Sequence, residues 1–116
     1  MAQEPLLVNL RKTVATAEAL RRDLLRDLHG AEEGERSAVR LEMILFYGNA
    51  FALVLDTLTG PLEPESPAVS AHRAAFWGRA VFQAWLNTGP SADVEQRGTL
   101  ERIWAQITRA VLDDQA

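Results

Sequence analysis

The residues best suited to chemistry form a polar line along the segment 35–59. Glu42, Asn49 and Asp56 recur every seven residues, so they share one narrow face if the segment is helical. Carboxylate and amide oxygens are ligands that Mg²⁺ and Ca²⁺ prefer. Residues seven apart lie about 10 Å apart along a helix, so one ion would need ligands from a second helix. The line therefore fits a cation-binding or acidic recognition groove, or, as we favour, the solvated face of an apolar helix.

The two histidines, His29 and His72, offer no catalytic or metal-binding pattern. Neither follows a glutamate by three residues, as a di-iron helical bundle requires. Ser70, His72 and Arg73 come together near the start of one segment, but no nucleophile elbow or glycine-rich loop accompanies them. The lack of cysteine excludes disulfides, thiolate nucleophiles and cysteine-bound metal centres. We therefore expect a non-enzyme without metal or cofactor.

The charged residues narrow the choice of partners. Asp and Glu total 16 against 12 Lys and Arg, which gives a formal net charge of −4. Nucleic-acid-binding domains usually carry a basic surface, so the charge balance argues against nucleic acid as a partner. Arg21 interrupts an otherwise apolar stripe, and is expected either to extend to solvent or to pair with a carboxylate across a packing interface.

Three breaks rich in glycine and proline divide the chain into segments with helical periodicity. They are centred on Gly30 to Gly34, on Gly60-Pro61 and on Gly89-Pro90. The sequence predicts helices at about 5–29, 35–59, 68–88 and 92–113. Helices of this length joined by short connections favour an all-α fold, an antiparallel up-down-up-down four-helix bundle, with residues 1–116 as a single helical domain.

The second and third predicted helices are apolar over more of their circumference than a bundle helix needs. Large exposed apolar patches usually mark interfaces, and two-fold dimers are the commonest oligomers. We therefore predict a homodimer that uses these two helices, with Gly48, Ala50 and Ala52 allowing close helix approach. The candidate contact residues are Ile44, Tyr47, Phe51, Val54, Phe76, Trp77 and Trp85.

The function that these observations favour is a non-catalytic protein–protein interaction module in the cytoplasm. The opening residues have no secretory pattern, and the longest apolar run, Met43 to Leu55, is too short to span a bilayer. One alternative is a helix-turn-helix DNA-binding regulator with its turn at Gly89, although Trp85 is bulky for that motif and Asp93 and Glu95 would repel phosphate. A less favoured alternative is a ligand-binding bundle or small enzyme with a cavity near Tyr47, His72 and Gln83.

Overall fold

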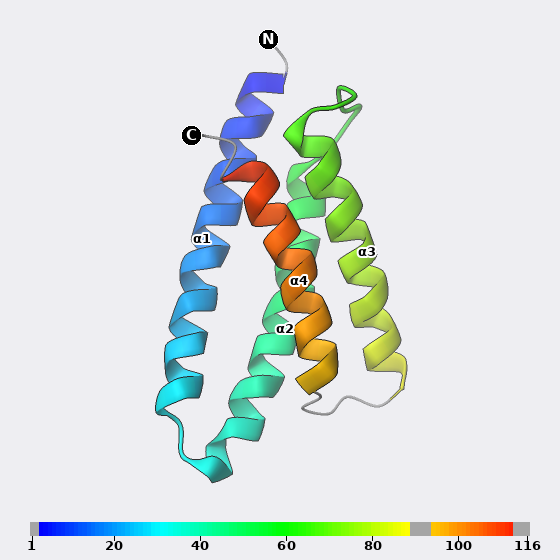
Figure 1. The fold of residues 1–116 in the computed structure, drawn as a ribbon. Coiled ribbons are helices and arrows are strands. Elements are labelled where there is room, and N and C mark those ends of the chain that lie inside the picture. The colour runs from blue at the N-terminus through cyan, green and yellow to red at the C-terminus, as the bar shows by residue number, and fades with distance from the viewer. Residues whose placement is uncertain (1–2, 89–93, 113–116) are drawn as a thin grey trace.

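The computed structural model describes residues 3–88 and 94–112. These residues form four helices and contain no strand, which confirms the predicted all-α class. The helices are α1 (Gln3–Gly30), α2 (Glu33–Thr57), α3 (Pro67–Asn87) and α4 (Val94–Val111) (Figure 1). For α1, α2 and α3 the observed ends differ from the predicted ends by two residues or fewer, whereas the predicted ends of the last helix, 92 and 113, lie outside the described residues.

The connection between α2 and α3 is shaped by local backbone preferences. Gly60 has a φ of 85°, a conformation that glycine adopts without steric penalty. Ser66 has an extended backbone at the N-cap, and α3 then begins with Pro67. Proline suits the first turn because its φ is already helical and its missing N–H would have no partner there. Gly60 thus helps to turn the chain after α2, and Pro67 fixes where α3 starts.

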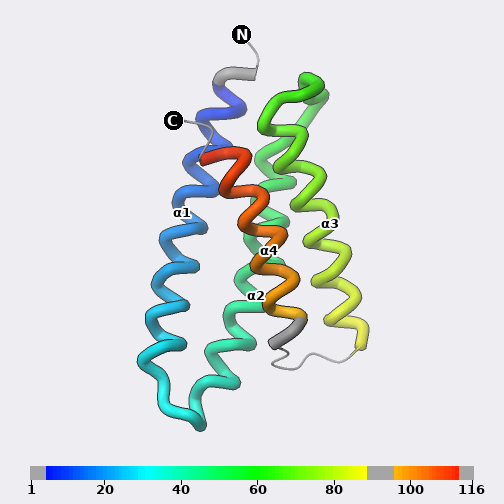
Figure 2. The backbone as a smooth tube through the Cα atoms, in the orientation of Figure 1, coloured from blue at the N-terminus to red at the C-terminus, as the bar shows by residue number. Residues whose placement is uncertain are grey.

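The helices lie side by side with their ends grouped in two sets (Figures 1 and 2). The beginning of α1, the α2–α3 connection and the end of α4 gather at one end of the molecule. The α1–α2 connection lies at the other end, where this hairpin extends beyond α3 and α4. The molecule measures 51 × 30 × 17 Å, so it is long and thin.

Helix α2 packs against each of the other three helices and contributes seven buried residues to the core. Ile44, Tyr47, Phe51 and Val54 are all fully buried within the single chain. This corrects the expectation of a broad unpartnered face on α2. That expectation assumed that no helix of a small bundle is enclosed on several sides, whereas α1, α3 and α4 together cover most of the apolar circumference of α2.

The seam between α2 and α3 depends on two glycines that each accept an aromatic ring. A Cβ atom at Gly48 would lie 2.5 Å from the Phe82 ring, and one at Gly78 would lie 2.5 Å from the Phe51 ring. Each helix therefore contributes one glycine and one phenylalanine to a reciprocal contact. The predicted close approach at Gly48 does occur, and the approaching helix is α3 of the same chain.

By length and composition alone, α2 is also apolar enough to cross a membrane. The core helix of a soluble protein has the same composition, and seven residues of α2 are buried within the chain. The hydropathy of α2 therefore does not distinguish a membrane-spanning helix from the core helix of a soluble protein. The cytoplasmic location stays a prediction.

Candidate functional site

The outer surface of α3 carries the two most exposed large apolar side chains of the described residues. Phe76 is 66% exposed and the neighbouring Trp77 is 61% exposed. The imidazole of His72 stacks on the Phe76 ring, with 6.4 Å between ring centroids and 18° between planes. His72, Arg73, Phe76 and Trp77 together line a shallow, mostly apolar hollow. Exposed, adjacent aromatic rings of this kind are typical anchors of protein interfaces.

The rest of this surface is made of small or aliphatic residues. Ala80 and Ala84 follow Phe76 and Trp77 along the exposed side of α3, and Val69 precedes them. Arg73 is exposed there, and α3 as a whole contains no acidic residue. The surface formed by Val69, Arg73, Phe76, Trp77, Ala80 and Ala84 is called the α3 surface below.

The predicted contact residues divide between this surface and the interior. Phe76 and Trp77 lie on the α3 surface, whereas Trp85 is 5% exposed and packs against Phe82, with ring centroids 5.6 Å apart. Trp85 and the four predicted contact residues of α2, Ile44, Tyr47, Phe51 and Val54, belong to the core of the single chain. Of the predicted contact residues, only Phe76 and Trp77 are therefore exposed on the single chain.

The predicted polar line on α2 is exposed along its whole length. Glu42, Asn49 and Asp56 are all accessible to solvent. Within the described part of the chain, no three histidine, aspartate or glutamate side chains gather where they could hold a metal ion. The arrangement therefore fits a solvated helix face.

A polar network joins α1 to α4 across the edge of the core. Glu18 accepts hydrogen bonds from Arg21 Nε at 2.7 Å and from the indole Nε1 of Trp104 at 3.0 Å. Arg21 NH1 also lies 3.5 Å from Glu101 Oε1 on α4. Of the two arrangements that the sequence left open for Arg21, the structure has the one in which Arg21 pairs with a carboxylate of the facing helix. These contacts satisfy the polar atoms that the helix packing partly removes from water.

The pKa values of Glu18 and Arg21 are shifted by their mutual contact, and that of the neighbouring Tyr47 is shifted mainly by burial. Hydrogen bonding from Arg21 lowers the pKa of Glu18, and Glu18 in turn raises the pKa of Arg21. Burial raises the pKa of Tyr47 to about 12, although the nearby Arg21 guanidinium acts in the opposite direction. At neutral pH Glu18 and Arg21 are therefore charged and Tyr47 is neutral, which fits a structural network.

A second apolar hollow lies between α1 and α2, and the sequence did not indicate it. Leu20 and Leu53, 54% and 51% exposed, flank small residues that include Ala17 and Ala50. The hollow has a volume of about 520 Å³. The available signal was Leu20 itself, an apolar residue outside the buried stripe of α1.

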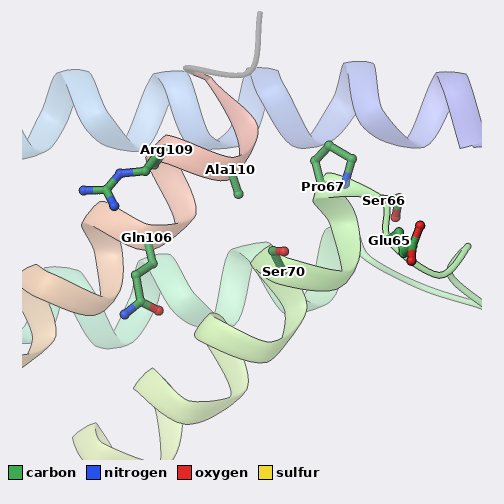
Figure 3. Close-up of a pocket in the computed structure, with 7 residues that line it drawn as sticks. All are labelled: Glu65, Ser66, Pro67, Ser70, Gln106, Arg109 and Ala110. Carbon is green, nitrogen blue, oxygen red and sulfur yellow. The ribbon is translucent and has the colours of Figure 1, made fainter.

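A third hollow lies between the start of α3 and the end of α4 (Figure 3). Ser66 and Ser70 line it from the α3 side, and Gln106 and Arg109 line it from α4. The guanidinium of Arg109 points away from the serines in Figure 3. The polar groups thus do not converge on one point, as recognition of a small ligand would require.

The structure bears differently on the two alternative functions, the ligand-binding bundle or small enzyme and the helix-turn-helix regulator. Tyr47 is fully buried in the core, whereas His72 stacks on Phe76 at the α3 surface and Gln83 is exposed, so these three side chains do not share a cavity. For the helix-turn-helix alternative, Gly89 and Asp93 lie outside the described residues, as does the side chain of Glu95. DNA binding therefore stays an untested alternative.

Comparison with known proteins adds no relative. No protein-family model matches the chain, and the curated proteins and the solved structures gave no match either.

Proposed function

We propose that this protein is a non-catalytic interaction module, an up-down-up-down antiparallel bundle that forms a homodimer through its α3 surface. The observation that carries the proposal is the exposure of Phe76 and Trp77 side by side on one helix. Monomeric proteins rarely leave two adjacent aromatic rings in water, and aromatic residues supply a large share of interface binding energy. The grouping of helix ends in Figure 1 supports the proposed topology.

A second copy suits this surface because its large residues, Phe76 and Trp77, are followed along α3 by the small residues Ala80 and Ala84. Phe76 and Ala80 are four residues apart, so they lie on the same side of α3 about one turn apart. When two such helices cross antiparallel about a two-fold axis between these positions, Phe76 meets Ala80 of the partner subunit, and the reverse contact follows by symmetry. The α3 surface is therefore complementary to itself.

The charge of α3 indicates what kind of contact this would be. Because α3 contains no acidic residue, two copies of it cannot form salt bridges with each other. A dimer through α3 alone would be held by apolar burial, which added salt does not weaken. An acidic partner protein would instead pair with Arg73, and that complex would weaken as salt is added.

The test is the mass in solution, measured by light scattering from low to high micromolar concentration. We expect a dimer that persists in high salt and that Phe76→Glu converts into a folded monomer. Leu53→Glu is the matched control, because Leu53 is also an exposed apolar residue but lies on α2, away from α3. This variant should remain dimeric.

Two results would overturn the homodimer. One is a monomer at every concentration, after which capture of an acidic helical partner at low salt becomes the question. The other is a dimer that survives Phe76→Glu and dissociates in Leu53→Glu, which would move the contact to the hollow between α1 and α2.

A further inference from the structure

Positive charge gathers where the α1–α2 hairpin extends past the first turns of α4. Arg36 and Arg40 come from the start of α2, Arg97 from the start of α4 and His29 from the end of α1. These four side chains, with Leu25 and Leu28 of α1 as an apolar wall, surround a hollow of about 440 Å³. We call this the arginine hollow; the helix ends that contribute these residues, the end of α1 and the starts of α2 and α4, lie away from the α2–α3 connection (Figure 1).

Among the described residues, the arginines of the hollow contact only neutral groups: Arg36 Nε donates to the Ala31 carbonyl oxygen at 3.4 Å, and Arg97 NH1 lies 3.8 Å from Met43 Sδ. Arg36, Arg40 and Arg97 make no ion pair with any carboxylate in the described ranges 3–88 and 94–112. The Nε atoms of Arg40 and Arg97 are buried and have no hydrogen-bond partner. A buried donor on a charged group that bonds to nothing is unfavourable, because it has lost its water without replacement.

One carboxylate reaches the hollow, and it is already engaged. Glu101 also lines the hollow, but its Oε1 lies 3.5 Å from Arg21 NH1 of the network between α1 and α4. Three guanidinium groups against this one carboxylate leave an excess of two positive charges around the hollow. A phosphate monoester carries about −1.5 to −2 charges at neutral pH, so it would balance this excess better than a single carboxylate would.

We propose that the arginine hollow binds a small phosphate monoester, with the phosphate between Arg40 and Arg97 and the organic part against Leu25 and Leu28. Planar guanidinium groups match phosphate oxygens in pairs, and Arg40 and Arg97 both line the hollow. The volume is within the range of small-molecule sites and exceeds what a bare phosphate fills. The site is independent of the α3 surface.

The test follows the Nε–H signals of the arginines by NMR, in a buffer without phosphate. Phenyl phosphate is the main probe, with inorganic phosphate, benzoate and chloride at matched ionic strength. We expect phenyl phosphate to shift the Arg40 and Arg97 signals saturably and to bind more tightly than inorganic phosphate, because its ring contacts the leucines. Benzoate should bind more weakly, and chloride should cause no saturable shift.

The variants Arg40→Gln and Arg97→Gln should each weaken phenyl phosphate binding about tenfold or more. The matched control is Arg102→Gln, which removes the same charge from an exposed site on α4 outside the hollow and should bind normally. Circular dichroism first establishes that each variant is folded, and the NMR titration of the unaltered chain needs no variant at all. Equal, unsaturated shifts at every arginine, or equal responses to chloride and phosphate, would overturn the proposal.

Discussion

Helices α2 and α3 are both apolar over a large part of their circumference, yet their large apolar side chains differ in burial. Helix α2 lies among three other helices, so Tyr47 and Phe51 are fully buried. Helix α3 packs mainly against α2 and α4, so its opposite side leaves Phe76 and Trp77 in solvent. Each helix contributes seven buried residues to the core, but only α3 leaves large aromatic side chains exposed. What distinguishes them is how the other helices are distributed around each one, which a helix's own sequence does not encode.

The largest expected difference between the two helices is in the free energy of unfolding. Phe51→Ala would leave a cavity among α2, α3 and α4, and should destabilise the protein by about 3–5 kcal/mol. Phe76→Ala is the same substitution on α3 and should change the stability of the monomer by no more than about 0.5 kcal/mol, because its ring is mostly in solvent.

Urea denaturation of both variants, at concentrations where the chain is monomeric, measures the contrast. Losses of equal size would show that Phe76 also belongs to the core, and the distinction between the two helices would be lost.

The burial of α2 can be measured without a substitution by titrating Tyr47, the chain's single tyrosine. Its pKa should be about 12 in the folded protein, against an ordinary value of about 10. The raised pKa means that the buried neutral phenol favours the folded state below pH 10. This contribution is lost as the pH rises from about 10 towards 12.

Ultraviolet absorbance of the tyrosinate gives the midpoint of the Tyr47 ionisation directly, and circular dichroism at each pH tests whether the helices persist. Ionisation near pH 10 in a chain that is still helical would contradict the burial of Tyr47.

A smaller effect is expected at the seam where α2 and α3 meet. In Gly48→Ala the new methyl group would lie 2.5 Å from Phe82 ring atoms, so the ring or the helix must move. Overpacking typically costs about 1–3 kcal/mol, and the better helix propensity of alanine returns about 1, so we expect a net loss on the order of 1 kcal/mol.

Gly34→Ala is the control for this prediction, since it makes the same change in the same helix at a position with open space around it. It should stabilise the protein by up to about 1 kcal/mol. Thermal unfolding of both variants shows whether each substitution stabilises or destabilises the protein. Stabilisation by Gly48→Ala would mean that the seam between α2 and α3 is looser than described.

The sequence predicts best those elements whose apolar stripe is narrow. On α4 the four residues Leu100, Ile103, Trp104 and Ile107 form a narrow apolar stripe and are all buried, because a narrow stripe has only one orientation that removes it from water. Arg21 was similarly recognisable as a charge that needs a partner. Helix α2 was harder, because a broad stripe is compatible with several arrangements of neighbours.

The arginine hollow was beyond prediction for a different reason. Arg36 and Arg40 are separated from Arg97 by more than fifty residues, and only the packing of α4 against the hairpin brings them together. Each arginine alone looks like an ordinary surface residue of a helix. Sites that depend on the relative placement of several helix ends leave no local pattern of spacing.

The overhang of the α1–α2 hairpin has a consequence for hydrogen exchange. Residues 29–38 are exposed except for Ala31, which is half-buried, so little tertiary packing holds the first turns of α2 closed. Their amide protons should exchange through brief local openings, while those around Tyr47 and Phe51 exchange only when the whole chain unfolds. We therefore expect a gradient of protection along this single continuous helix, lowest at the exposed end that contributes Arg36 to the arginine hollow.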